Sequence, residues 1–341
     1  MVMASEGVLF IAEVSANHLG SLDRAHQLID AAADAGATAV KFQTYTADTM
    51  TLDLPEFSVT SGHELWGGRT LYSLYQEAMT PWEWHPELFV HCRERGVIPF
   101  SSPFDRTAVE FLESLDAPMY KIASLETSDH ELIRRVATTG KPVIISTGAT
   151  EFSEIESLVE VFNSTGNQNL TLLVCTSSYP ADPSEAHLRR MKTLSDAFNV
   201  KVGLSDHTLG IGVSVAAIAL GATAIEKHIT LKRSDGGADG AFSMEPSEFK
   251  TLVQEGIAAK SALGNGEWKI QKSEAESRRL RRSLYIVQDV TAGEIATKTN
   301  VRAIRPGAGC SPSLLGEILG KTFKDSQLKG TPLTLDKLDI N

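Results

Sequence analysis

Short apolar runs alternate with helix-patterned segments along most of the chain. Eight runs have the length and the aliphatic and aromatic content of buried parallel strands: residues 8–14, 39–42, 97–100, 119–122, 143–145, 170–174, 202–204 and 224–225. Between them, apolar residues recur three and four apart, with Gly near several segment ends. The clearest helices are expected over residues 22–35, 86–95, 107–115, 131–138 and 154–163, and a short helix is expected within residues 210–221. Eight strand–helix repeats favour a (β/α)8 TIM barrel of the α/β class, although the count alone leaves a doubly wound sheet open.

The pattern changes near residue 268. Residues 1–268 carry the strand–helix repeats, and residues 269–282 are rich in charge, with an Arg-rich cluster, so we expect a linker there. Residues 283–341 contain a β-like run and several Gly- and Pro-containing turns, which predict a second, compact domain. About sixty residues are marginally stable alone, so this domain is expected to dock against a barrel.

Composition and charge narrow the class of protein. The chain has 341 residues, 42% of them hydrophobic, and a formal net charge of −11, which argues against general binding to nucleic acid or to acidic membranes. Its three cysteines are scattered and form no CxxC pair, which favours a reducing cytoplasm. The N-terminus lacks a signal-peptide pattern and no run of about 18 apolar residues occurs, so we expect neither secretion nor a membrane span.

Two histidines follow neighbouring predicted strands. His207 follows the seventh strand and His228 the eighth, and the carboxyl ends of barrel strands are where active sites of this architecture form. A single histidine in such a place is more often a satisfied polar group than a ligand. Two histidines placed alike favour a metal site, and the open coordination positions fit Mn²⁺, Mg²⁺ or Co²⁺.

Other strand ends carry lysines and hydroxyls. Lysine charge beside Ser, Thr and loop amides is what a phosphate requires, so we predict an anionic phosphorylated substrate. Alternatively, the lysines extend to solvent and the serines cap the following helices. Glu13 is a candidate general acid or base, or else the partner of a lysine. The polar residues at the strand ends include Glu13, Lys41, Gln43, Ser102, Lys121, Ser124, Ser146, Ser177 and Ser205, with Phe104 and Tyr179 beside them.

These strand ends form a series of motifs that resembles the sialic acid synthase family, the phosphoenolpyruvate-dependent nonulosonic acid synthases. The resemblance covers nearly the whole chain, and its tail, with Arg305-Pro306-Gly307, looks like the antifreeze-like (SAF) domain. The motifs are IAEV (11–14) with NH (17–18), VKFQT (40–44), SSPFD (101–105), YKIAS (120–124), ISTG (145–148), GLSDHT (203–208) and EKH (226–228).

The resemblance implies a transferase that condenses phosphoenolpyruvate with an N-acylated amino sugar. It implies a divalent metal, Mn²⁺ first, on His207 and His228, and a homodimer in which Arg305 of the SAF domain covers the partner's barrel. It gives Glu13, Lys41 and Lys121 catalytic roles. The substrate-binding residues that it implies are Gln43, Ser102, Phe104, Ser124, Ser146, Ser177, Tyr179, Ser205, Asp239 and Arg305.

Two segments indicate a subgroup. Residues 78–85 and 239–246 look more like pseudaminic acid synthases than N-acetylneuraminate synthases, which implies 2,4-diacetamido-2,4,6-trideoxy-L-altrose as the sugar and a product for cell-surface or flagellar glycans. N-Acetylneuraminate or legionaminate synthesis is the alternative. Trp82, Trp84 and Phe242 could form an apolar wall against a 6-deoxy sugar, or pack as ordinary loop residues. Ser177 departs from the asparagine of several family members.

Two alternative functions from outside this family remain. A metal-dependent aldolase also uses histidines in a barrel, but it would release no phosphate. A non-catalytic sugar-binding protein is suggested only by the antifreeze-like tail, and fold does not give function.

Overall fold

A computed structural model describes residues 7–59 and 66–339 of the chain. The chain divides into two compact units, with the boundary between Gly264 and Asn265. Among the described residues, no helix is both long and apolar enough to cross a membrane.

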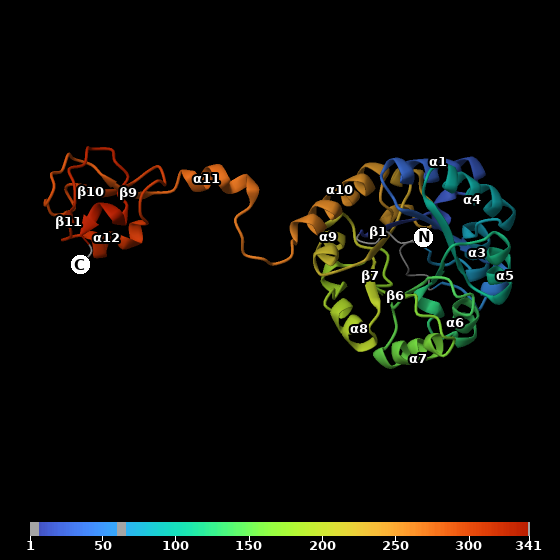
Figure 1. Ribbon diagram of the computed structural model, residues 1–341. Helices are drawn as coiled ribbons and strands as arrows, with labels where there is room; N and C mark the ends of the chain where they lie inside the picture. Colours follow the sequence, from blue (N-terminus) through green and yellow to red (C-terminus); the bar gives the residue numbers. More distant parts are fainter. Residues whose placement is uncertain (1–6, 60–65, 340–341) are drawn as a thin grey trace. The chain divides into compact units, whose positions relative to one another are not determined.

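The first unit is a closed barrel of eight parallel strands in sequence order, surrounded by helices (Figure 1). The TIM barrel expected from the strand–helix rhythm is therefore confirmed, and each predicted strand coincides with an observed one to within a few residues. The strands are β1 (Leu9–Glu13), β2 (Ala39–Thr44), β3 (Ile98–Pro103), β4 (Tyr120–Ile122), β5 (Val143–Ser146), β6 (Leu170–Cys175), β7 (Lys201–Ser205) and β8 (Ala224–His228).

Helices follow the strands, and several begin at a side-chain cap. Ser21, Asp105 and Asp129 each accept a hydrogen bond from backbone N–H groups of the first turn of α1, α5 and α6. The helices expected from periodicity are all present, and α2, α3, α8 and α10 are additional. The helices of this unit are α1 (Leu22–Asp34), α2 (Ala47–Met50), α3 (Leu71–Ala78), α4 (His85–Glu94), α5 (Arg106–Ser114), α6 (His130–Ala137), α7 (Phe152–Asn163), α8 (Arg190–Phe198), α9 (Gly212–Ala219) and α10 (Pro246–Ala262).

Side-chain alternation along the strands separates the barrel interior into an apolar and a polar layer. Leu9 and Ile11 of β1 belong to a buried apolar cluster with residues of the other strands, such as Phe100 and Leu173. The next residue of the same parity in β1 is Glu13. The same step from apolar to polar occurs in β2, β4, β5 and β8, so the sequence of each strand places charged or hydroxyl side chains at its carboxyl end.

The second unit is built from two small antiparallel pairs. β9 (Ser283–Ile286) pairs with β10 (Val301–Ile304), and β11 (Thr322–Phe323) pairs with β12 (Leu338–Asp339). They enclose an apolar core of their own that includes Leu284, Ile286 and Phe323. The charged segment that precedes them contains α11 (Ala275–Arg279), and α12 (Leu315–Ile318) follows β10.

Candidate active site

A cavity of about 300 Å³ opens at the carboxyl ends of the barrel strands. Nearly all of the predicted site residues line it, from all eight strands or the loops that follow them. They are Glu13, Lys41, Gln43, Phe104, Lys121, Ser124, Ser146, Ser177, Tyr179, Ser205, His207, His228 and Asp239. Two predicted residues do not: Ser102 is buried on β3, and Arg305 lies in the second unit.

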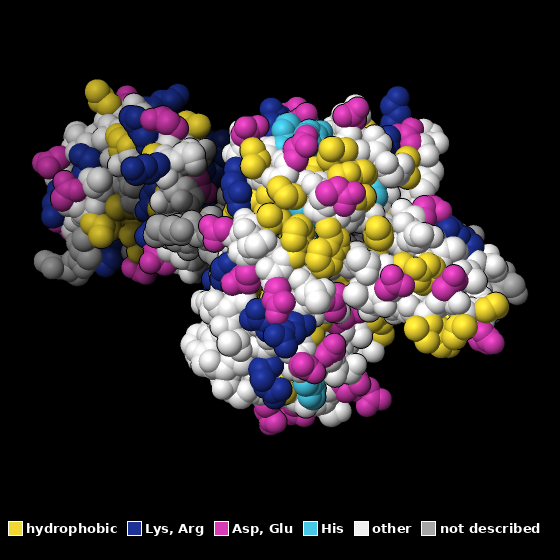
Figure 2. Space-filling view, turned by 90° about the vertical axis from the view of Figure 1, so that its right-hand side faces the viewer, with side chains coloured by type: hydrophobic (Ala, Val, Ile, Leu, Met, Phe, Trp, Pro, Cys, Tyr) yellow, Lys and Arg dark blue, Asp and Glu magenta, His cyan; other side chains and the backbone are white. Residues whose placement is uncertain are grey.

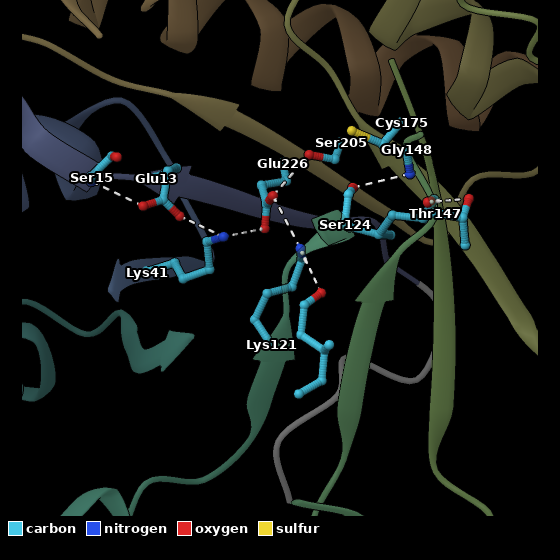
Figure 3. Close-up of polar contacts among 12 residues, drawn as sticks. Glu13, Ser15, Lys41, Lys121, Ser124, Thr147, Gly148, Cys175, Ser205 and Glu226 are labelled. Carbon is cyan, nitrogen blue, oxygen red and sulfur yellow. Dashed lines mark hydrogen bonds and ion pairs between the residues drawn. The ribbon is translucent and has the colours of Figure 1, made fainter. Parts of the chain in front are cut away.

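A chain of ion pairs crosses the floor of this cavity (Figure 3). The Lys41 ammonium lies 2.6 Å from a Glu13 oxygen and 3.1 Å from a Glu226 oxygen. Lys121 lies 3.7 Å from the other Glu226 oxygen, to which the Ser205 hydroxyl donates at 2.9 Å. The strand register brings these groups together, because Glu13 pairs with Lys41 on one side and with His228 on the other.

Burial perturbs the charges of this network. Desolvation lowers the pKa of Lys41 to about 8, against the attraction of Glu226. Burial alone would raise the pKa of Glu226, but Lys121 and Lys41 hold it well below its usual range, so this carboxylate stays ionised. Two cations and two anions thus share a site with almost no solvent exposure. An incoming anion can therefore compete with Glu13 and Glu226 for the lysines.

The two histidines have the features of metal ligands. Their ring centroids are 5.4 Å apart, and His207 Nδ1 donates to the Thr176 carbonyl at 3.0 Å, so that in the neutral imidazole Nε2 carries the lone pair. Burial lowers the pKa of His228 well below its usual range, so this imidazole is neutral, and its Nδ1 is buried without a hydrogen-bond partner. Within the described part of the chain no three His, Cys, Asp or Glu side chains form a complete metal site. The pair therefore fits a divalent ion whose other ligands come from substrate and water.

Part of the polar layer next to the histidines is lined by hydroxyls. The Ser124 hydroxyl accepts from the Gly148 N–H at 3.0 Å, while the Ser146 hydroxyl is buried without a partner. Glycine at position 148 allows the Ser124 and Ser177 hydroxyls to lie close to the backbone, because a Cβ there would collide with the Ser177 oxygen and press on that of Ser124. These hydroxyls beside Lys121 provide the charge and donors that a phosphate needs.

The remaining predicted residues lie above the ion pairs. Gln43 donates to the Ser15 hydroxyl at 2.9 Å, and Asp239 accepts from the Ala16 N–H at 3.4 Å. The Tyr179 ring lies 4.5 Å from the His207 ring, between centroids. These side chains can orient a polyhydroxylated substrate next to the histidines.

The two tryptophans considered for an apolar wall do not line the cavity. Trp82 stacks on Phe111 at 4.8 Å between ring centroids, and Trp84 meets His18 edge-on at 5.5 Å. Both tryptophans pack against neighbouring rings, as expected for residues of the loop that leads into α4.

Two carboxylates that the sequence reasoning did not assign also line the cavity. Glu226 is the centre of the ion-pair network, and Glu126 follows β4 in a short 3₁₀ helix. The parity of β8, in which Ala224 and Glu226 point to the same side, could have identified Glu226. Burial raises the pKa of Glu126 to about 6 despite nearby Lys121, and one of its oxygens is buried without a partner.

Replacing Glu126 by glutamine is expected to stabilise the protein at pH 8 but not at pH 4.5. The folded carboxyl has a higher pKa than the unfolded one, so stability is lost as pH rises from about 4.5 to about 6. Glutamine cannot ionise and avoids this loss, which we expect to be about 1–2 kcal/mol above pH 7. Thermal unfolding of both proteins across this pH range measures the difference. An equal melting temperature at every pH would contradict the raised pKa.

Comparison with known proteins identifies the family of the chain. The NeuB family model matches residues 28–268 and the SAF domain model residues 281–339. The chain is 43% identical to pseudaminic acid synthase of Campylobacter jejuni over 316 residues, 92% of each chain, and 42% identical to that of Helicobacter pylori, over 96% of this chain and 97% of the other. The N,N'-diacetyllegionaminic acid synthase of Campylobacter jejuni is 37% identical, over 94% of this chain and 98% of the other.

A solved structure of a related enzyme has the same fold. The N-acetylneuraminic acid synthetase of Leptospira borgpetersenii, in complex with citrate, superposes with a TM-score of 0.71 at 33% identity, covering 80% of this chain and 90% of that one. The resemblance first seen in the strand-end motifs is confirmed. The chain belongs to the NeuB family, with a SAF domain at its C-terminal end.

Proposed function

We propose that the chain is a pseudaminic acid synthase. It condenses phosphoenolpyruvate with 2,4-diacetamido-2,4,6-trideoxy-L-altrose and releases pseudaminate and phosphate. The observation that carries the proposal is one cavity in which a lysine-rich, hydroxyl-lined end adjoins a pair of buried histidines. The choice of sugar is supported by the higher identity to two pseudaminic acid synthases, 42–43%, than to the legionaminic acid synthase of Campylobacter jejuni, 37%.

The proposed reaction needs an anion site beside an aldehyde site. Lys121, with Ser124, Ser146 and Ser177, would hold the phosphate of phosphoenolpyruvate, and Lys41 would face its carboxylate. Gln43, Tyr179 and Asp239 would orient the open-chain sugar. His207 and His228 would hold a divalent ion, Mn²⁺ before Mg²⁺ or Co²⁺, which supplies Lewis-acid polarisation of the aldehyde oxygen.

Bond changes then follow in a fixed order. Carbon three of phosphoenolpyruvate attacks the aldehyde carbon, and the carbonyl oxygen becomes the new hydroxyl by gaining the proton that the attacking water gives up. Water adds at carbon two, and the bond from carbon two to the phosphate oxygen breaks, so phosphate leaves. Glu13 would take the proton of the attacking water, because it already lies 2.6 Å from Lys41, whose lowered pKa suits proton exchange near neutral pH.

A homodimer is part of the proposal, with residues 1–268 as the synthase barrel, 269–282 as linker and 283–341 as the SAF domain covering the partner's barrel. The linker, residues 269–282, contains 6 Lys and Arg against 2 Asp and Glu, residues 283–341 contain 7 against 6, and residues 1–268 contain 19 against 35. A basic linker and an acidic barrel attract each other, which supports docking of the second unit on a barrel. On the barrel face in Figure 2, charges of both signs are interspersed with hydrophobic side chains. We place the reaction in the cytoplasm, with a product that is used for cell-surface or flagellar glycans.

Phosphate release from phosphoenolpyruvate tests the proposal. Purified protein with Mn²⁺ is given the 6-deoxy altrose sugar, N-acetylmannosamine or no sugar, and each assay is repeated with EDTA. We expect metal-dependent release with the altrose sugar alone. Release with N-acetylmannosamine would keep the reaction and change the substrate, and silence with both sugars would overturn the proposal.

A further inference from the structure

The cavity has a second half that the reaction scheme above does not use. Its polar half is formed by the strand ends, and its other half is mostly apolar. The apolar lining consists of Tyr45, Met50, Val59, Trp66, Leu71, Leu74, Tyr75, Ala78, Phe104 and Leu125. The site otherwise binds charged and polar groups, so an apolar surface of this extent indicates that part of one substrate is apolar.

One helix face makes up much of this half. Leu71, Leu74, Tyr75 and Ala78 of α3 line the cavity, and their spacing of three, four and seven residues places them on one side of the helix. Tyr72 of the same helix does not line the cavity, and its hydroxyl instead donates to Asp48 at 3.1 Å. We call these four cavity-lining residues the α3 wall.

Aromatic packing fixes the α3 wall against the barrel. The Tyr45 ring, which follows β2, meets Tyr75 edge-on at 5.8 Å and Phe104 edge-on at 5.2 Å, between centroids. Tyr45 is only 2% exposed. Trp66 donates its indole N–H to the Ala238 carbonyl at 2.9 Å, which holds it on the facing loop. The wall is thus a preformed surface on the barrel unit.

We infer that the α3 wall binds the methyl-bearing end of the sugar and selects for a 6-deoxy substrate. This inference rests on the proposed function. The reacting aldehyde carbon must lie by the phosphoenolpyruvate and the histidines, so the far end of the open-chain sugar extends out of the polar half. That end carries the C6 methyl and the 4-acetamido group, which match an apolar wall better than a hydroxymethyl group does.

The size of the selection follows from the chemistry of the wall. A single methyl group in an apolar pocket is worth about 10- to 200-fold in kcat/KM, and such a pocket rejects an added hydroxyl by only about a hundredfold. We therefore expect the protein to prefer the 6-deoxy sugar over its 6-hydroxy counterpart, 2,4-diacetamido-2,4-dideoxy-L-altrose, by about 10- to 100-fold.

Three variants test the assignment by phosphate release with the two sugars. Leu71→Asn places an amide on the wall and is expected to reduce the preference to about threefold or less. Tyr75→Ala removes wall area and is expected to lower kcat/KM for the 6-deoxy sugar about tenfold, with the KM for phosphoenolpyruvate unchanged. Tyr72→Ala is the matched control on the same helix and should leave both sugars within about twofold.

Each result decides between defined outcomes, with thermal unfolding used to check that the variants fold. An unchanged preference in folded Leu71→Asn, or an equal loss in Tyr75→Ala and Tyr72→Ala, would overturn the wall while leaving the proposed function intact. A wild-type protein that turns over the 6-hydroxy sugar equally well would also overturn it. Failure of the wild type to release phosphate with either sugar would instead overturn the proposed function, and the inference with it.

Discussion

His228→Ala is expected to lower sugar-dependent phosphate release by about a thousandfold or more. Lewis-acid stabilisation by a bound divalent ion is worth several kcal/mol, and each 1.36 kcal/mol corresponds to about tenfold in rate. His228 lies at the end of β8, its buried Nδ1 makes no hydrogen bond and lies 3.7 Å from an Asp239 oxygen, and its low pKa keeps the imidazole in the neutral form that binds metals. Removing it leaves only His207 as a nitrogen donor.

Direct metal binding separates this loss from misfolding. Mn²⁺ titration by calorimetry or electron paramagnetic resonance should show weakened binding in His228→Ala, while the melting temperature without metal stays close to that of the wild type. His91→Ala is the control, because His91 pairs with Asp30 between α1 and α4 and does not line the cavity. Wild-type Mn²⁺ affinity in His228→Ala would show that the two histidines are not the metal site.

Much of the site could be predicted because each barrel strand is a short, continuous segment that can be recognised in the sequence. Each strand is a short apolar run, and the residues at its end or just after it lie at the carboxyl edge, so the places of Lys41, Lys121 and His207 could be predicted from position alone. Alternation along a strand carries the same information. It places Glu226 inside with His228, although the sequence reasoning used only the histidine.

Other features depend on contacts between distant segments and could not be predicted. Whether Lys41 faces solvent or lies between Glu13 and Glu226 is decided by the register of β2, β1 and β8, which no local pattern encodes. The same holds for the apolar wall. Trp82 was a candidate because of its size, but its ring stacks on Phe111 of α5 and does not line the cavity. Residues of α3 line the cavity instead.

Lys227→Met is expected to destabilise the barrel by about 3–5 kcal/mol, because it leaves a buried carboxylate without its cation. Lys227 points away from the cavity and is almost fully buried. Its ammonium donates to Asp206 at 3.0 Å and to the carbonyls of Thr208 and Gly210 at 2.6 and 3.2 Å. Asp206 in turn accepts from the backbone and hydroxyl of Thr208 and from the Ser214 hydroxyl.

The contacts of Lys227 and Asp206 also hold the two proposed metal ligands, since His207 lies between Asp206 and Thr208, and His228 follows Lys227. Lys227→Met should therefore lower both the melting temperature, by roughly 10 °C, and the affinity for Mn²⁺. Adding Asp206→Asn removes the unpaired charge and should recover part of the stability. Lys192→Met breaks an exposed pair with Asp196 and should cost at most about 1 kcal/mol. Equal losses in Lys227→Met and Lys192→Met would show that burial does not set the strength of this pair, and that the loop carrying His207 is held by other contacts.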